Sequence, residues 1–171
     1  IEIKPDYAEA HSNLGTILKE LGNLKEAEFF YRKAIEINID LAEAHYNLGN
    51  TLKDIGKLKK AELSYRKAIE IKPDYAEAHS NLGTILNDLG KSQEAELSYR
   101  KAIEIKPDYE MALKNLLIIL RNLGKLKELL LLSKSILESK SMNQGCKLIA
   151  SLEITITHFI RGDCSKVLLN L

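Results

Sequence analysis

The sequence predicts an all-α fold in which pairs of antiparallel helices recur along the chain. The string AEAH opens at Ala8, Ala42 and Ala76, and the string YRKAIEI opens at Tyr31, Tyr65 and Tyr99. Glycines recur 34 residues apart, at Gly22, Gly56, Gly90 and Gly124. Apolar residues within each period follow helical spacing, and a 34-residue period of this kind indicates a repeat of two helices.

Both helices of a repeat can be recognised in the first full period. Leu14, Leu18 and Leu21 fall on one helical face, and Ala27 and Tyr31 belong to the face of the next helix. Each helix is expected to span about 12–15 residues. The glycine between them fits a left-handed helix C-cap, a conformation that favours glycine.

Small side chains are expected where the two helices of a repeat meet, because a larger side chain would overpack the contact. They are Gly15, Gly49 and Gly83 in the first helices and Ala27, Ala61 and Ala95 in the second helices. Between repeats, Asp74 is expected to cap the next helix, and Glu77 three residues later would complete a capping box.

The period divides the chain into six segments. Residues 1–7 end a preceding, truncated repeat, and residues 8–41, 42–75 and 76–109 are three full repeats. Residues 110–143 form a divergent repeat, and residues 144–171 a degenerate, truncated repeat whose turn is expected at Gly162. Because both ends fall inside a repeat, we expect the chain to be a fragment of a longer protein.

This pattern resembles the tetratricopeptide repeat (TPR) family over roughly residues 1–138. The matching positions in the first full repeat are His11, Leu14, Gly15, Leu18, Ala27, Tyr31 and Ala34. The proline that usually closes the pattern is replaced by Ile39 and restored by Pro73 and Pro107. The resemblance implies a right-handed superhelical solenoid whose concave face is lined by the first helix of each repeat.

By matching positions, the resemblance also implies the lining of a peptide-binding groove. The predicted residues are Glu9, Ser12, Asn13, Thr16, Lys19 and Glu20 in the first repeat; Glu43, Tyr46, Asn47, Asn50, Lys53 and Asp54 in the second; Glu77, Ser80, Asn81, Thr84, Asn87 and Asp88 in the third; and Asn115 in the divergent repeat.

Four of these residues, Asn13, Asn47, Asn81 and Asn115, occupy one position in successive repeats. An amide offers both a donor and an acceptor, so this column can hold the backbone of an extended peptide whatever its sequence. The column is similar to the asparagine ladder of O-linked N-acetylglucosamine transferases. The alternative is that asparagine is a frequent choice of the family here and bonds locally.

Residues that carry chemistry do not converge. His11, His45 and His79 are separated by a repeat translation of about 10 Å, whereas metal ligands lie within roughly 2.1 Å of one ion, so we predict packing positions with satisfied imidazoles. Cys146 and His158 are the candidate pair for nucleophilic catalysis, and twelve residues of one helix place them about 18 Å apart. The sequence therefore predicts no enzyme activity, no metal site and no cofactor.

The composition narrows the range of partners. The 25 Lys and Arg residues nearly balance the 24 Asp and Glu residues, giving a net charge of +1, whereas nucleic-acid binders usually show a basic excess. The two cysteines are predicted to be free thiols, and no apolar run approaches the roughly 18 residues of a membrane span. We expect a cytoplasmic protein with a protein or peptide partner, and neither a nucleic acid nor a membrane.

The divergent repeat breaks the pattern, with Leu117 in place of the helix glycine. Leu129, Leu130, Leu131 and Leu132 follow one another and sweep about 300° around a helix. One helix cannot bury every side of itself, so this run predicts self-association, for example as a homodimer, through the C-terminal repeats.

Taken together, these observations favour a protein–protein interaction scaffold that binds an extended segment in its groove. The alternatives are the non-catalytic, substrate-docking arm of a larger enzyme, such as a transferase, and a self-assembling structural array. TPR receptors for the acidic tails of chaperones use lysine and arginine in the groove. The matching positions here hold Ser12, Thr16, Glu77 and Asn81, and Asn47 alone fits, so such a tail is not the expected ligand.

Overall fold

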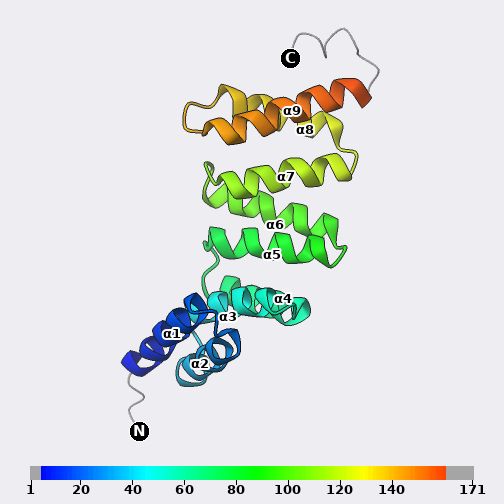
Figure 1. Ribbon diagram of the computed structural model, residues 1–171. Helices are drawn as coiled ribbons and strands as arrows, with labels where there is room; N and C mark the ends of the chain where they lie inside the picture. The colour runs from blue at the N-terminus through cyan, green and yellow to red at the C-terminus, as the bar shows by residue number, and fades with distance from the viewer. Residues whose placement is uncertain (1–4, 161–171) are drawn as a thin grey trace. The chain divides into compact units, whose positions relative to one another are not determined.

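The computed structural model describes residues 5–160, and over this range the chain forms α-helices joined by turns (Figure 1). The helices are α1 (Pro5–Glu20), α2 (Leu24–Ile37), α3 (Ala42–Asp54), α4 (Leu58–Ile71), α5 (Ala76–Asp88), α6 (Ser92–Ile105), α7 (Glu110–Asn122), α8 (Leu126–Glu138) and α9 (Gln144–Ile160). No strand occurs between residues 5 and 160, so the predicted all-α helical repeat is confirmed. Gly162 and Cys164 lie outside the described residues.

The chain divides into two compact bodies. The N-terminal body, Ile1–Gly90, contains helices α1 to α5, and the C-terminal body, Lys91–Leu171, contains α6 to α9. Within the N-terminal body α1 packs on α2 and α3 packs on α4, as expected for paired helices. The handedness of the superhelix and the exact repeat boundaries stay predictions.

The turn inside each repeat depends on a glycine in the left-handed conformation, as the sequence predicts. The φ angle is 80° at Gly22, 78° at Gly56 and Gly90, and 69° at Gly124. After α1, the Gly22 N–H donates to the Lys19 carbonyl at 3.0 Å and the Asn23 N–H donates to the Leu18 carbonyl at 2.8 Å. These are the two bonds of a Schellman motif, which satisfies the last carbonyls of the helix.

The predicted capping box at Asp74 is wrong. Helix α5 begins at Ala76, its N-cap residue is Tyr75, and no side-chain hydrogen bond caps it. Asp74 lies too early, inside a turn that closes when the Tyr75 N–H donates to the Lys72 carbonyl at 3.2 Å. The Tyr75 ring at the N-cap position packs against Tyr46 of α3.

In the N-terminal body, the two helices of a repeat meet where a glycine faces a tyrosine. A Cβ atom on Gly15 would lie 2.9 Å from Cε1 of Tyr31, and one on Gly49 would lie 2.7 Å from Cε1 of Tyr65. Both tyrosines are buried, with exposed fractions of 1% and 0%. A larger side chain would have to displace a closely packed ring, which confirms the predicted close approach at these two positions.

In the divergent repeat, the large and the small side chain of this contact are exchanged between the two helices. Leu117 of α7 takes the position of Gly15 and Gly49, and Ser133 of α8 takes that of the tyrosines. Leu117 and Ser133 are both fully buried. The large side chain has moved from the second helix to the first, and core exchanges that conserve volume are tolerated best. The loss of the glycine is visible in the sequence, whereas the compensation by Ser133 depends on how α7 packs on α8.

Second helices are joined to the next repeat by a recurring group of ion pairs. In the N-terminal body, Glu28 of α2 accepts hydrogen bonds from Arg32 one turn later, at 2.9 Å, and from Lys57 at the start of α4, at 2.8 Å. The C-terminal body repeats this arrangement at the equivalent residues, 68 positions later.

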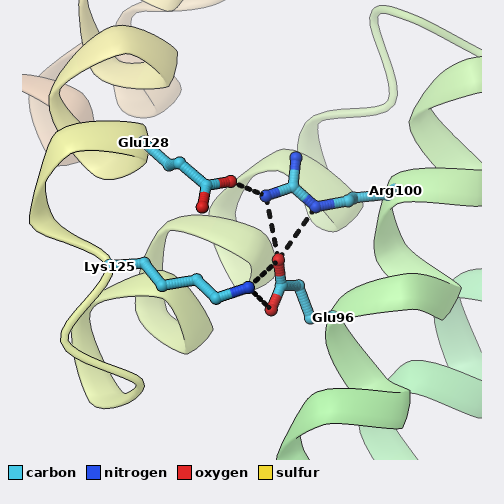
Figure 2. A network of polar contacts seen from close by, with 4 residues as sticks. All are labelled: Glu96, Arg100, Lys125 and Glu128. Carbon is cyan, nitrogen blue, oxygen red and sulfur yellow. Dashed lines mark hydrogen bonds and ion pairs between the residues drawn. The ribbon is translucent and has the colours of Figure 1, made fainter.

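Figure 2 shows the C-terminal version, in which one carboxylate binds two cations. Glu96 Oε1 lies 2.9 Å from Arg100 Nη2, and Glu96 Oε2 lies 2.8 Å from Lys125 Nζ; Arg100 also pairs with Glu128 of α8. Burial opposes ionisation of Glu96, but the hydrogen bonds and charges of Lys125 and Arg100 outweigh it and hold its pKa below the usual value. Since the folded pKa is the lower one, the stabilisation is present above the unfolded pKa of about 4.5 and is lost as the pH falls through the folded pKa.

We expect Glu96→Gln to lower the free energy of unfolding at pH 7 by about 1–3 kcal/mol, because the partly buried, charge-assisted bonds to Arg100 and Lys125 are weakened. Glu104→Gln is the matched control, since its pair with Lys101 is exposed and should contribute less than about 0.5 kcal/mol. Urea unfolding followed by circular dichroism from pH 7 to pH 3 measures both. The deficit of Glu96→Gln should shrink below pH 4.5. Equal stabilities of the two variants at pH 7 would contradict this role of Glu96.

Candidate binding face

The predicted groove residues of the N-terminal body lie on α1, α3 and α5, and two contacts show that these helices are neighbours. Lys19 Nζ of α1 lies 3.4 Å from Asp54 Oδ2 of α3, and Asn81 Nδ2 of α5 donates to Asn50 Oδ1 of α3 at 2.9 Å. We define the first-helix face as Glu9, Asn13, Thr16, Lys19 and Glu20 of α1; Glu43, Tyr46, Asn47, Asn50, Lys53 and Asp54 of α3; and Glu77, Asn81, Thr84, Asn87 and Asp88 of α5. The remaining predicted residue, Asn115, lies on α7 of the C-terminal body.

Two predicted lining residues are not accessible. Ser12 is 6% exposed and Ser80 is fully buried, so neither side chain can contact a ligand in this conformation. Their backbone carbonyls accept hydrogen bonds from Thr16 and Thr84, one helical turn later. The sequence pattern placed both serines on the right helices, but it could not show that these short side chains lie below the surface.

The buried tyrosines of the second helices reach this face through their hydroxyl groups. The Tyr31 hydroxyl lies 3.1 Å from Thr16 Oγ1, and the Tyr65 hydroxyl donates to Asn50 Oδ1 at 2.8 Å. Each ring crosses the first helix of its repeat at the glycine, so the hydroxyl emerges among the face residues. Burial raises the pKa of both phenols, which therefore stay protonated at neutral pH.

Asn50 is the centre of a hydrogen-bond network. Its Oδ1 accepts from the Tyr65 hydroxyl and from Asn81 Nδ2, and Asn81 Nδ2 also donates to the Tyr46 hydroxyl at 3.2 Å. An amide nitrogen cannot accept, so these bonds fix the orientation of both amides. Three groups have no partner within residues 5–160: the amino group of Asn50, the Oδ1 of Asn81 and the hydroxyl proton of Tyr46.

The asparagine column is therefore not uniform. Asn81 uses its amide donors to join its repeat to the preceding one. Asn13 is exposed and Asn47 and Asn115 are half-buried, and their side chains form no hydrogen bond within the described part of the chain. The Asn81 amide therefore has a structural role, although its bonds reach the preceding repeat and are not local. The other three amides stay candidates for ligand contact.

Tyr46 and Tyr75 form an aromatic pair that the sequence pattern did not single out as one. Their ring centroids lie 4.8 Å apart at an interplanar angle of 36°, and Lys72 Nζ lies 4.9 Å from the Tyr75 centroid. Burial raises the pKa of Tyr75, and the neighbouring Tyr46 and the carboxylates of Glu43 and Glu77 raise it further. The signal that could have found the pair is that Tyr46 replaces a serine found in both flanking repeats.

The imidazoles of His45 and His79 form hydrogen bonds as predicted, whereas that of His11 stacks on Phe30 and forms none within residues 5–160. The Nε2 atom of His45 lies 2.9 Å from the Ile39 carbonyl, and that of His79 lies 2.9 Å from the Pro73 carbonyl. Each imidazole thus fastens the start of a first helix to the preceding junction. Burial lowers the pKa of His45, which favours the neutral ring.

Residues with catalytic potential stay apart. Cys146 is buried near the start of α9, burial raises the pKa of its thiol, and His158 lies near the other end of the helix. Within the described range, no group of three or more His, Cys, Asp or Glu residues could hold a metal ion. None of the helices between residues 5 and 160 has the length and apolarity needed to cross a bilayer.

Two cavities lie where successive second helices meet the first helix between them, and their lining contains no residue of the first-helix face. One of about 350 Å³ in the N-terminal body is lined in part by Ile35, His45, Ser64 and Lys67. One of about 540 Å³ in the C-terminal body is lined by the equivalent Ile103, Leu113, Leu132 and Ser135. Their recurrence at equivalent positions indicates a furrow inherent in the packing of helix pairs.

Paired helices, glycine turns and a recurring polar face define a two-helix repeat protein. Models described as tetratricopeptide repeat match residues 8–40, 76–109 and 30–62, and one described as TPR repeat matches residues 49–90. Together they span residues 8–109, more than half of the chain. The chain belongs to the tetratricopeptide repeat family.

Solved structures agree on the fold. The chain is 24% identical to YrrB, described as a TPR protein with an unusual peptide-binding site, with a TM-score of 0.80 over 94% of this chain and 80% of that chain. It is 20% identical to MamA, with a TM-score of 0.85 over 96% and 88%. It is 22% identical to the first TPR of Spaghetti (RPAP3) bound to the HSP90 peptide SRMEEVD, with a TM-score of 0.70 over 72% and 98%. No curated protein matches the sequence.

The network predicts different roles for two residues of one column. We expect Asn81→Ala to lower the free energy of unfolding by about 1–3 kcal/mol, because two hydrogen bonds between repeats are lost. Asn13→Ala should change it by less than about 0.5 kcal/mol, since the exposed Asn13 amide holds nothing in place. Thermal unfolding by calorimetry compares them, and similar losses in both variants would disprove the structural role of Asn81.

Proposed function

We propose that this chain is a protein-interaction scaffold that binds an extended peptide or protein segment along its first-helix face. The observation that carries the proposal is the oriented set of unused groups around Asn50. The amino group of Asn50 is a donor and the Oδ1 of Asn81 is an acceptor, and each peptide group offers one acceptor and one donor in return. Backbone contacts of this kind hold a segment without requiring a particular sequence.

The neighbouring amides support the same proposal. Asn13 and Asn47 belong to the same column and form no side-chain hydrogen bond within residues 5–160. Their fixed helices make the face preorganised, which lowers the entropy cost of binding. Among the similar structures, YrrB is described as having a peptide-binding site, and the Spaghetti domain is bound to a peptide.

The acidic peptide of the Spaghetti complex is not the ligand that we propose here. Glu43 and Glu77 lie on the first-helix face, and a chain of carboxylates would be repelled by them. Of the positions that match the chaperone-tail receptors, Asn47 alone offers a suitable side chain. The others hold Ser12, Thr16, Glu77 and Asn81, none of which is a lysine or arginine.

A docking arm of a larger enzyme would use the same face, so this alternative shares the proposed contacts. It differs from a free-standing scaffold in what the rest of the protein does. Within this chain we propose binding without catalysis, in the cytoplasm and without a cofactor, as the sequence predicts.

The test removes two amides that hold no structure. Peptides that bind the full chain are selected from a phage-displayed library of random sequences, and their affinities are measured by calorimetry. Asn13→Ala combined with Asn47→Ala should weaken binding by about 5- to 100-fold, because each lost hydrogen bond contributes about 0.5–1.5 kcal/mol. Asn23→Ala is the control, since Asn23 is exposed beside α2 and its side chain caps nothing. Unchanged affinity in the double variant would rule out backbone capture by Asn13 and Asn47.

We also propose that the C-terminal body self-associates through α8. Of the four leucines, Leu129 is fully buried, Leu130 and Leu132 are half-buried, and Leu131 is 71% exposed. Leu130 takes the position of the ion-pairing Glu28 and Glu96, so the apolar surface widens where the other repeats carry a charge.

Light scattering at micromolar concentration should show a dimer or larger species, and Leu131→Glu should return the chain to a monomer. Burying one such leucine is favourable by roughly 1.5–3 kcal/mol, which an introduced carboxylate would oppose. Leu63→Glu is the matched control, because Leu63 holds the same repeat position in the N-terminal body and is 68% exposed. A monomeric parent chain would refute self-association, and dissociation by Leu63→Glu as well would refute its assignment to α8.

A further inference from the structure

The charge of the first-helix face differs from that of the whole chain. The face carries six acidic residues, Glu9, Glu20, Glu43, Asp54, Glu77 and Asp88, and two basic residues, Lys19 and Lys53. Lys19 is already paired with Asp54. The chain as a whole has a net charge of +1, so the acidic excess is a local property of this face.

The acidic side chains are combined with an aromatic surface. Glu43 lies in the first turn of α3 and Glu77 in the first turn of α5. The negative charges of both carboxylates add to the effect of burial in raising the pKa of Tyr75. The Tyr46 ring lies 4.8 Å from the Tyr75 ring, and both are half-buried. Aromatic faces flanked by carboxylates attract cations through the ring quadrupole and through charge.

The chain itself shows that this environment accepts an ammonium group. Lys72 Nζ lies 4.9 Å from the centroid of Tyr75, although the same side chain could extend into solvent. Tyr46 offers a second ring, and its hydroxyl already accepts from Asn81, which leaves its proton for a ligand acceptor. The ring and the hydroxyl group of Tyr46 can therefore bind a side chain and a backbone carbonyl of the same ligand segment.

Tyr46 is also where the repeats differ. The equivalent residues in the flanking repeats are Ser12 and Ser80, and both are buried. A serine at this position is thus compatible with the fold. The tyrosine adds an aromatic ring, which packs against Tyr65 and Tyr75, and a hydroxyl group that accepts from Asn81.

We infer that the segment bound by this face is basic, with a lysine or arginine side chain placed against Tyr46 and Tyr75 between Glu43 and Glu77. This inference rests on the proposed function and adds the chemical class of the partner. The backbone of the segment lies along Asn47, and its further cations face the remaining carboxylates. Acidic peptides and nucleic acids are disfavoured, because their charges have the sign of the face.

The experiment uses the full chain and three synthetic peptides of about ten residues, a length that crosses three helices at roughly 3.3 Å per residue. The peptides alternate serine with lysine, glutamine or glutamate. Binding is followed by NMR titration, which detects weak complexes and locates them. The lysine peptide should shift the signals of Glu43, Tyr46, Tyr75 and Glu77, bind about 3- to 30-fold more tightly than the glutamine peptide, and weaken as salt is raised.

Two variants assign the preference to these residues. Glu43→Gln combined with Glu77→Gln should remove most of the lysine preference, whereas Glu26→Gln combined with Glu70→Gln, on the exposed surfaces of α2 and α4, should preserve it. Tyr46→Ser copies the flanking repeats, so it should fold and yet reduce binding of the lysine peptide by about 2- to 10-fold.

The outcomes separate the two proposals. If the glutamine peptide binds this face as tightly as the lysine peptide, the basic preference is wrong while peptide binding stands. If the lysine peptide binds elsewhere, or if the control double variant loses as much affinity as Glu43→Gln with Glu77→Gln, the assigned site is wrong. If no peptide shifts any residue of the face, the proposed function fails, and this inference fails with it.

Discussion

The contact between a glycine of the first helix and a tyrosine of the second determines much of the architecture of the N-terminal body. At Gly49 there is room for a hydrogen atom and none for a methyl group, so the Tyr65 ring lies directly against the α3 backbone. That position brings the buried phenol to the opposite side of α3, where its hydroxyl donates to Asn50. One packing contact thus sets the distance between the helices and also orients an amide on the binding face. The close approach of α3 and α4 and the orientation of Asn50 are therefore consequences of the same steric constraint.

The divergent repeat shows what happens when this constraint is removed. With Leu117 and Ser133 the core stays filled, but no phenol crosses the first helix. The equivalent of Asn50 is Ile118, which is 38% exposed, and the equivalent of Glu43 is Met111, which is 54% exposed. The face of α7 has lost both the polar network and the carboxylate. Core packing and surface chemistry changed together here, as expected if the tyrosine hydroxyl is what keeps a polar partner at that position.

The sequence predicted the fold well because its strongest signals are local. Glycine at the turn, small residues at helix contacts and histidine beside the junction each follow from backbone conformation or from volume, and a 34-residue period repeats them. The predictions that the structure contradicts concern displacements of less than one helical turn. Asp74 lies too early to cap α5, and Ser12 and Ser80 lie too deep to meet a ligand. Hydrogen bonds between repeats, such as that from Asn81 to Asn50, join residues 31 positions apart and depend on how helices stack, which a pattern within one repeat does not contain.

A nearly exact repeat makes its exceptions informative. Buried positions that recur from repeat to repeat are explained by packing, because each repeat must bury the same surfaces against its neighbours. A residue that differs in one repeat needs an explanation of its own, which is core packing for Leu117 and Ser133 and is indicated by the surroundings for residues nearer the surface. At position 46 a tyrosine replaces the serine of the flanking repeats, on a face that also carries carboxylates and amides. Its ring adds contact area there, and its hydroxyl group lies farther from the backbone than that of a serine. At position 130 a leucine replaces the glutamate found at Glu28 and Glu96. Because the exposed Leu131 lies beside it, this replacement removes a charge from an apolar surface. The two exceptions point in opposite chemical directions, one toward a polar, cationic partner and the other toward an apolar one. Comparing the repeats of a single chain therefore identifies surface residues, such as Tyr46 and Leu130, whose role differs from that of their equivalents in the other repeats.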